Sequence, residues 1–388
     1  MTGERQAADA IRFYDSKSWD YDATWHNDFT RRFMSYLDIQ PGQQVLDLAC
    51  GTGLLTFREA EAVGPQGHVI GVDVTPGMLA VATHRKTQGG DKYANTTFLQ
   101  GDVLHLEETE ALKGKQFDVI TVASALVLFP DPKAAIEHWA GFLKPGGVIA
   151  MDATHPRNLV SGMVLERVAR RLELPIPYNR SWSKSEDTLK QMLESAGVEV
   201  DQVVTVESQA GYGRRFYEME QWDDFFVENV IVKDVARTFA NNDIRRKAQK
   251  IYKEEWEKLA IDGKIEEIDS VFLGIARRRS GFLPFTHVPK DSISFTYADT
   301  RTVLRLSAVA ERTFCSGCGA PISMSYPSDP DGLGLCMATV DLETLKTEVA
   351  PKVVKHIFLR EKAPWVVLPE DGTERWGTSE DAHLLAQS

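Results

Sequence analysis

The chain has 388 residues, of which 43% are hydrophobic and 26% are charged, as in an ordinary globular protein of about two or three domains. Its formal net charge of −12 argues against a nucleic-acid partner, which normally needs a basic surface. No apolar run approaches the roughly 18 residues of a membrane span, and the polar residues 1–6 lead into no signal segment. Four cysteines are too few for a disulfide scaffold, so we expect a cytoplasmic protein with no membrane partner.

The first 40 residues are rich in aromatic and acidic side chains, and residues 27–37 have helical spacing. One interpretation is a helical lid that packs its aromatic side chains on the rest of the fold. The other places a few of these side chains over a ligand, with the candidates Tyr14, Tyr21, Trp25 and His26. The two interpretations are compatible.

The stretch 45–53, VLDLACGTG, is the strongest local signal in the chain. Its first four residues predict a short buried strand. Gly51 and Gly53 let the backbone pass close to a ligand, where a Cβ would clash. A helix that begins at Leu54 would direct its free N–H groups at that ligand. This pattern predicts a nucleotide-type site at the carboxyl edge of a parallel sheet, although it lacks the third glycine of the dinucleotide fingerprint.

Further strands are predicted over residues 68–74, 97–103, 117–123 and 148–152. The second and third strands end in an acid, Asp73 and Asp102, and a carboxylate at the end of the second strand can accept from both hydroxyls of a ribose. Helices are predicted to connect the strands, and residues 143–147, LKPGG, form a turn into the fifth strand. Five such units in series predict a doubly wound parallel α/β sheet.

These features occur in order within about 105 residues, and together they resemble class I S-adenosyl-L-methionine (SAM)-dependent methyltransferases of the ubiquinone/menaquinone type. The resemblance implies a Rossmann-like sheet whose sixth and seventh strands form an antiparallel hairpin at one edge. It also implies SAM as the cofactor. Residues 124–127, SALV, do not match the acidic motif of DNA amino-methyltransferases, which disfavours methylation of nucleic acid.

The same resemblance assigns the cofactor contacts. Asp47 and the backbone of Ala49, Gly51 and Gly53 would hold the methionine part. Asp73 would hold the ribose, and Asp102 with Val103 the adenine. The remaining expected contacts are Tyr21, Val74, Met78 and Ser124. A general base helps if the acceptor is a hydroxyl or an acidic carbon. His155, just past the fifth strand, is the candidate base, with His26 and Tyr21 behind it.

Two segments, about 155–182 and 208–265, interrupt the pattern within a first domain of residues 1–279. Helices are predicted at 159–172, 183–196, about 219–235 and 242–259, a sixth strand at 198–207 and a seventh at 266–277. We expect the two insertions to build a substrate cap, with residues 211–217 and Trp222 as candidate lining. The alternative is an element for dimerisation or packing, and a homodimer is among the expected partners.

A second domain is predicted over residues 280–388, with short strands at 292–297, 303–309, 321–326, 335–339 and 353–359. Its knuckle 314–322, FCSGCGAPI, resembles half of a glutathione-dependent formaldehyde-activating (GFA-like) zinc domain. The further cysteines of that family are missing, because none lies between Cys50 and Cys315. Cys315 and Cys318 could bind zinc only if Cys336 and His356 completed the set, so we assign no metal site.

The sequence therefore predicts SAM-dependent methyl transfer to a small molecule, with an aromatic compound or a secondary metabolite as the expected acceptor. One alternative is a protein that binds SAM without transferring methyl, in a structural or cyclase-like role. Another is zinc-dependent carbon–sulfur lyase activity in the second domain.

Overall fold

The structure is a computed structural model, and it describes residues 7–8, 11–12, 14–15, 18–23, 25–174, 178–228, 239, 242–278, 285–294, 300–305, 310–316, 321–336, 355–356 and 373–375. The chain divides into two compact units, Met1–Arg279 and Ser280–Ser388. Among the described helices, none combines the length and the apolar character that a membrane span requires.

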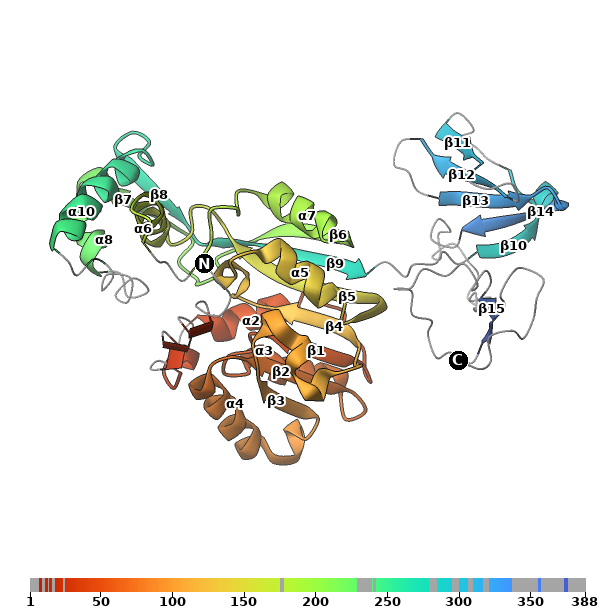
Figure 1. Ribbon diagram of the computed structural model, residues 1–388, viewed down its shortest axis with the longest axis horizontal. Coiled ribbons are helices and arrows are strands. Elements are labelled where there is room, and N and C mark those ends of the chain that lie inside the picture. The colour runs from red at the N-terminus through yellow and green to blue at the C-terminus, as the bar shows by residue number, and fades with distance from the viewer. Residues whose placement is uncertain are drawn as a thin grey trace. The chain divides into compact units, whose positions relative to one another are not determined.

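The first unit is built on a seven-stranded sheet with the order β3-β2-β1-β4-β5-β9-β6 (Figure 1). Strands β1 to β5 are parallel, and β9 is antiparallel to both β5 and β6. The strand bounds are Gln44–Leu48, His68–Asp73, Thr96–Gln100, Phe117–Val122 and Leu143–Thr154 for β1 to β5, Val198–Glu207 for β6 and Ser270–Arg278 for β9. The predicted Rossmann-like sheet with an antiparallel pair at one edge is confirmed.

The sheet is accompanied by the described α-helices of this unit. They are α2 (His26–Met34), α3 (Leu54–Val63), α4 (Pro76–Gly89), α5 (Pro132–Ala140), α6 (Val160–Arg171), α7 (Glu186–Ser195), α8 (Trp222–Glu228) and α10 (Asn242–Glu257). Asp131 and Ser185 accept from backbone N–H groups in the first turns of α5 and α7. The apolar pattern predicted that helix α7 starts at residue 183. The cap at Ser185 explains why α7 instead begins at Glu186.

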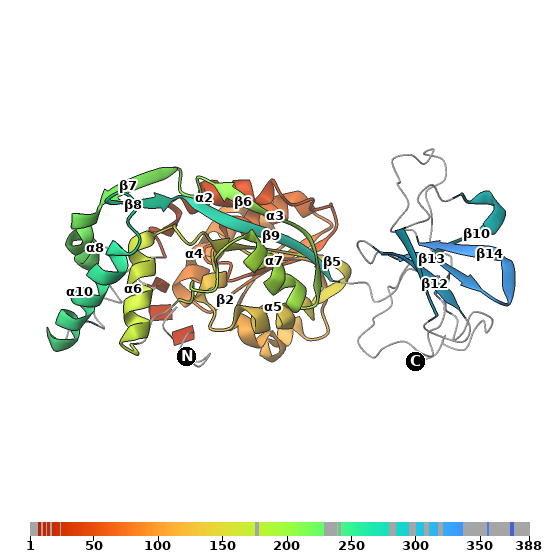
Figure 2. The same ribbon diagram turned by 90° about the horizontal axis from the view of Figure 1, so that it is seen from above.

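Alternate residues of each strand point to opposite faces of the sheet. Both faces are buried, because helices pack on each of them. On one face, Leu46 and Leu48 of β1 join a core with Trp139 of α5 and Leu193 of α7. On the other face, Phe29 of α2 and Leu55 of α3 pack on β5 and β9. Figure 2 shows α5 and α7 on one side of the strands and α2 and α3 on the other. The near-continuous apolar runs of the parallel strands follow from this double burial.

The predicted turn over residues 143–147 is wrong, because these residues belong to β5. The chain continues as a strand through a positive φ of 78° at Gly146, and the pairing with β4 shifts register between Phe117 and Val119. Residue 147 has no room for a side chain, since a Cβ there would lie 3.0 Å from the Phe117 carbonyl oxygen. The two glycines thus permit a bulged strand rather than a break.

A lobe beyond the sheet, which we call the cap, contains α6, α8, α10 and the antiparallel pair of β7 (Arg214–Glu218) and β8 (Lys264–Ile268) (Figures 1 and 2). It has its own apolar core, in which Val164 of α6 packs with Tyr252 and Trp256 of α10. Helix α10 was predicted, and α8 covers part of the predicted helix 219–235, of which residues 229–235 lie outside the described residues.

One prediction for this region is wrong, because the predicted seventh strand is divided into β8 and β9 at Asp269. The strand β7 at residues 214–218 was not predicted. The Asp269 carboxylate accepts from the N–H groups of Ala210 and Tyr212, at 2.7 and 2.9 Å. This long-range contact fixes the turn between the two strands, and no local pattern encodes it.

The second unit contains an antiparallel sheet with the order β10-β14-β13-β12-β11. Its bounds are Phe285–Pro289, Asp329–Cys336, Pro321–Tyr326, Glu311–Cys315 and Arg301–Leu304, and β15 (Lys355–His356) pairs with β16 (Glu374–Arg375). Strand β10 was not predicted, and the predicted strand 292–297 overlaps a 3-10 helix over Lys290–Ser292. Cys315 ends β12 and Cys336 ends β14. Cys318 and the side chain of His356 lie outside the described residues.

Candidate functional site

The turn after β1 has a backbone that favours glycine. Ala49, Gly51 and Gly53 have φ values of 53°, 55° and 79°, in the left-handed region. Gly53 immediately precedes α3, so the free N–H groups of that helix begin at the turn. A Cβ on Gly51 would meet no protein atom within 4 Å, which leaves open space above this residue.

Two acids project at the carboxyl ends of β2 and β3. Asp73 is 7% exposed, and its two carboxylate oxygens accept from Gly51 N and Thr75 N, both at 2.8 Å. Burial raises the pKa of Asp73 above its usual value. Asp102 accepts from Leu104 N at 2.9 Å. Each carboxylate oxygen has two lone pairs, so both acids keep acceptor capacity for a ligand.

A pocket that is partly open to solvent lies above these groups. It brings together most of the residues predicted from the sequence: Tyr21, Ala49, Gly51, Asp73, Val74, Met78, Asp102, Val103 and Ser124. Ala7, Thr75, Leu104, Ala123, Ala125, Leu128 and Phe129 complete the lining with Tyr14, which the sequence offered only as a lid residue. Among the residues that the structure describes, the lining contains aspartates but no lysine, arginine or histidine, so this part of the pocket suits a ligand that carries hydrogen-bond donors or positive charge.

The N-terminal segment covers the pocket and is tied to the turn after β1. The Asp22 carboxylate accepts from Thr52 Oγ1 at 2.5 Å and pairs with the Arg85 guanidinium. Gly77 N donates to Asp15 Oδ1 at 2.7 Å, which joins the same segment to α4. The segment thus combines the two predicted roles, since it packs as a lid and also contributes side chains to the pocket.

Two of the four aromatic lid candidates do not line the pocket. The His26 ring stacks between the rings of Tyr21 and Trp25, at centroid distances of 4.1 and 3.7 Å. Burial lowers the pKa of His26 to about 3, so this imidazole is neutral at physiological pH. His26 and Trp25 therefore support Tyr21 from behind.

Asp47 also lies outside the lining, below the turn. It is 1% exposed, and Thr56 Oγ1 donates to its Oδ2 at 2.5 Å. Thr121 Oγ1 lies 2.7 Å from Glu59 Oε1 and 3.5 Å from Asp47 Oδ1, so the two buried acids share this hydroxyl. Burial raises the pKa of Asp47 to about 7 and that of Glu59 well above its usual range. Asp47 thus braces the turn from the interior.

His155, the candidate base, is not brought to the pocket. Its Nδ1 accepts from Arg157 N at 3.0 Å, and its ring lies 5.3 Å from that of Phe272. Burial, helped by the positive charge of Arg157, lowers the pKa of His155. The loop after β5 thus places this imidazole beside Phe272 of β9 and close enough to Glu266 of β8 to feel its charge.

The sequence analysis missed Asp152, two residues before the end of β5. It is 3% exposed, and its Oδ1 accepts from Ser124 N at 2.6 Å. Burial raises the pKa of Asp152 to about 7. Its place near the carboxyl end of a central parallel strand is the signal that could have identified it.

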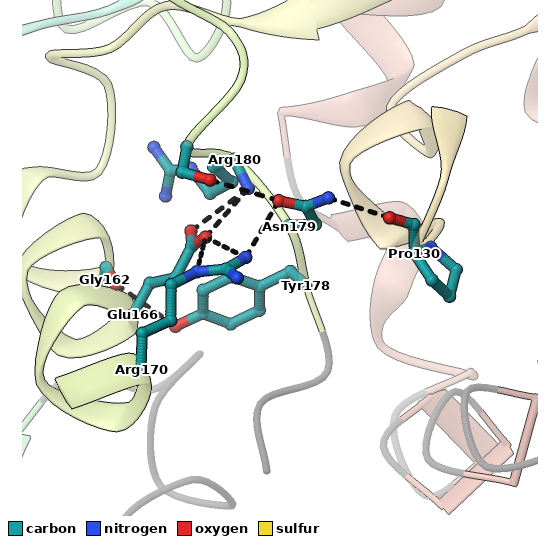
Figure 3. A network of polar contacts seen from close by, with 8 residues as sticks. Pro130, Gly162, Glu166, Arg170, Tyr178, Asn179 and Arg180 are labelled. Carbon is teal, nitrogen blue, oxygen red and sulfur yellow. Dashed lines mark hydrogen bonds and ion pairs between the residues drawn. The ribbon is translucent and has the colours of Figure 1, made fainter. Parts of the chain in front are cut away.

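A polar network fastens the cap to the wall of the pocket (Figure 3). The Glu166 carboxylate, on α6, accepts from the Arg170 side chain and from Arg180 N. Arg170 also donates to Asn179 Oδ1 at 2.8 Å, and Asn179 Nδ2 donates to the Pro130 carbonyl at 3.0 Å. Because Asn179 N also donates to the carbonyl of residue 127, this network anchors the loop that carries Leu128 and Phe129 of the lining.

Comparison with known proteins places this site in a family context. Residues 39–219 match the methyltransferase domain family. A demethylmenaquinone methyltransferase of Lactobacillus johnsonii is 34% identical over 133 residues, which are 34% of this chain and 52% of that protein. An aklanonic acid methyltransferase of a Streptomyces species is 29% identical over 201 residues, 47% of this chain and 89% of that protein. The chain thus spans about half the length of the demethylmenaquinone methyltransferase.

Among solved structures, the magnesium protoporphyrin IX methyltransferase of Synechocystis with bound SAH aligns with 70% of this chain and 99% of its own, at 14% identity and a TM-score of 0.42. The family match, together with the strand order and the glycine turn, identifies residues 39–219 as a class I SAM-dependent methyltransferase domain.

Proposed function

We propose that the protein transfers a methyl group from SAM to a small-molecule acceptor. The observation that carries the proposal is the pocket at the carboxyl edge of the sheet. Gly51, Asp73 and Asp102 line this pocket, and a Cβ on Gly51 would meet no protein atom within 4 Å. The donor set fits the cofactor, because ribose hydroxyls and an adenine amino group are hydrogen-bond donors and a sulfonium is a cation.

In this proposal each part of the lining has a role. Asp73 accepts from the ribose hydroxyls, while Gly51 N and Thr75 N hold its carboxylate in place. Asp102 and Val103 hold the adenine, and the backbone of residues 49–53 holds the methionine part. The bound cofactor supplies a methyl group already activated on sulfur, so the protein's main task is to orient the acceptor and exclude water.

The acceptor would lie between the N-terminal lid and the wall that the cap network anchors. Tyr14, Tyr21, Leu128 and Phe129 give that side of the pocket an aromatic and apolar lining. We therefore propose an apolar, aromatic acceptor, since such surfaces bury planar ligands well.

The first test is calorimetric titration of SAM into the wild type, Asp73→Ala and Asp118→Ala. Loss of the Asp73 carboxylate should weaken binding about ten- to a hundred-fold, or roughly 1.5–3 kcal/mol. Asp118 is the matched control, because it lies at the amino end of β4, where it pairs with Lys144. Equal affinity in wild type and Asp73→Ala would contradict the proposed site, and micromolar binding would justify a screen of aromatic acceptors for methyl transfer.

Three further proposals concern the second unit, the cellular location and the oligomeric state. We propose that the second unit is a degenerate GFA-like domain, supported by its antiparallel sheet and the cysteines at the ends of β12 and β14. We further propose that the protein is cytoplasmic and pairs into a homodimer. Sedimentation of the full chain tests the dimer, and elemental analysis for zinc tests the metal-free state of the second unit.

A further inference from the structure

The wall of the pocket after β4 is a short turn that its own hydrogen bonds hold only in part. Leu126–Leu128 form a single 3-10 turn, and Leu128 N donates to the Ala125 carbonyl at 2.8 Å. Phe129 N reaches the carbonyl of the first turn residue only at 3.4 Å, and the next residue, Pro130, has no N–H to donate. Leu128 and Phe129 both line the pocket, so their positions depend on contacts from outside the turn.

Asn179 supplies those contacts at both ends of the turn. Its backbone N–H donates to the Val127 carbonyl at 2.6 Å. Its side-chain Nδ2 donates to the Pro130 carbonyl at 3.0 Å (Figure 3). The two carbonyls stand on either side of the two lining residues, Leu128 and Phe129. One residue of the segment before α7 thus clamps this part of the wall.

The cap network determines which way the Asn179 amide points. Its Oδ1 accepts from the Arg170 guanidinium at 2.8 Å, and Arg170 also donates to the Glu166 carboxylate, which is 2% exposed. A guanidinium has only donors, so the oxygen of the amide must face Arg170 and the nitrogen must face Pro130. The network therefore presents a donor to the wall.

The segment that carries Asn179 is itself fixed to the cap and to the sheet. Tyr178 Oη donates to a carbonyl of α6 at 3.3 Å. The Arg180 guanidinium donates to the Asn158 carbonyl, and the Asn158 side chain donates to the Ser270 carbonyl of β9 at 3.0 Å. Asn179 thus holds the wall from a frame that is anchored on both sides.

Leu128 is the lining residue at which the cap, the sheet and the pocket meet. Its side chain packs against the apolar core of the sheet and also against the core of the cap. The neighbouring Phe129 packs on α5, where its ring lies 5.1 Å from that of Trp139. The place of Leu128 in the pocket therefore depends on how the turn sits between the cap and the sheet.

We propose that Asn179 is a positioning residue for the methyl acceptor, whose donor to Pro130 fixes Leu128 and so sets the width of the apolar side of the pocket. This inference rests on the proposed function and deepens it, since it gives the cap a part in acceptor selection. Asn179 is not among the described lining residues, so it acts through the wall rather than by contact with the ligand.

The chain offers a matched pair of variants. Asn179→Asp keeps the shape of the side chain and the oxygen that faces Arg170, but it replaces the donor to Pro130 by a second acceptor. Two acceptors that face each other repel, so the turn should leave its clamp. Ser181→Ala is the control, because it removes a donor to the same Asn179 Oδ1, at 3.3 Å, and leaves the Pro130 contact intact.

The experiment measures the affinity of two neutral aromatic probes, naphthol and the larger phenanthrol, by fluorescence titration at neutral pH. The protein is saturated with S-adenosylhomocysteine (SAH), so that no methyl is transferred. In Asn179→Asp the affinity for naphthol should fall about three- to tenfold, as for one lost hydrogen bond. The ratio of phenanthrol to naphthol affinity should rise, because a released wall admits the larger ring. Ser181→Ala should match wild type in both respects.

The affinity for SAM distinguishes positioning of the acceptor from general damage to the pocket. It should stay within about twofold of wild type in Asn179→Asp, since the proposed cofactor contacts Asp73 and Asp102 share no hydrogen bond with Asn179. Equal losses of SAM and naphthol affinity, or an unchanged ratio of the two probe affinities, would overturn the inference. Failure of the wild type to bind either probe would refute the aromatic acceptor and this inference with it. Absence of SAM binding in every protein would refute the proposed function itself.

Arg170→Lys covers the case in which Asn179→Asp fails to fold. Arg170 is half-exposed, and a lysine there can still pair with Glu166, but it lacks the fork that reaches Glu166 and Asn179 together. The Asn179 amide then loses its fixed orientation, so the probe affinities should shift in the same direction by a smaller factor. Probe affinities equal to those of wild type in Arg170→Lys would overturn the inference.

Discussion

The burial of Asp152 predicts how stability should depend on pH. In the unfolded chain an aspartic acid has a pKa of about 3.9, whereas burial raises the pKa of Asp152 in the folded state to about 7. Between these values the folded state holds a proton that the unfolded state has lost. The free energy of unfolding of the wild type should therefore fall as the pH rises from about 4 to 7, because of this group, and then level off.

The magnitude follows from the difference of about three pKa units. At about 1.4 kcal/mol per unit, ionisation of this one side chain should cost the wild type about 4 kcal/mol by pH 8. Asp152→Asn carries no such cost and keeps an acceptor for Ser124 N. Its free energy of unfolding relative to wild type should therefore increase by up to about 4 kcal/mol between pH 4.5 and pH 8.

Urea denaturation at a series of pH values, followed by far-ultraviolet circular dichroism, measures this difference. Asp118→Asn is the control, since it removes a carboxylate at the amino end of β4, where that carboxylate pairs with Lys144. A difference between Asp152→Asn and wild type that stays flat from pH 4.5 to 8 would refute the reasoning. It would mean that Asp152 ionises in the folded protein as it does in water.

Three further predictions concern the turn, the lid and the cap. Gly53→Ala should destabilise the fold by about 1–3 kcal/mol in urea melts, because its φ is 79° and a Cβ would lie 2.9 Å from Phe57 Cε2. The added Cβ of Gly51→Ala meets no atom, so this variant should lose less stability than Gly53→Ala but should bind SAM more weakly. Tighter SAM binding by Gly51→Ala than by Gly53→Ala would contradict the assigned site. Asp22→Ala should speed proteolysis within residues 1–40 and weaken SAM binding, as it removes the partner of Thr52 and Arg85; unchanged cleavage would show that the lid is held elsewhere. Asn179→Ala should increase hydrogen exchange in residues 126–130, while Ser181→Ala, at the edge of the network, should not.

Several features of the sheet could be predicted because their signals are local. A buried strand, a glycine turn and a helix follow one another within residues 44–63, and each is encoded by its own residues. Asp73 and Asp102 stand directly after predicted strands. In a parallel sheet the carboxyl ends meet at one edge, so these acids had to lie near each other. The antiparallel pair at the other edge came from the family resemblance, and the β9–β6 pairing confirms it.

The wrong predictions share a different physical origin. The division between β8 and β9 depends on Asp269, which accepts from residues almost 60 positions earlier. The strand at residues 214–218, which was not predicted, forms by pairing with β8, in which Ile265 and Glu267 are buried. Propensity along the chain carries no information about such partners.

The sequence by itself thus determined the first five strands, the glycine turn after β1 and the acids that follow β2 and β3, because apolar runs, glycine and acid placement act within a few residues. Only the tertiary structure decided which ionisable groups face the pocket. The loop after β5 turns His155 away, α3 and β4 enclose Asp47, and Ser124 and β9 enclose Asp152. Burial of a charge depends on surfaces that meet only when distant segments pack, and that burial also sets whether the charge exists.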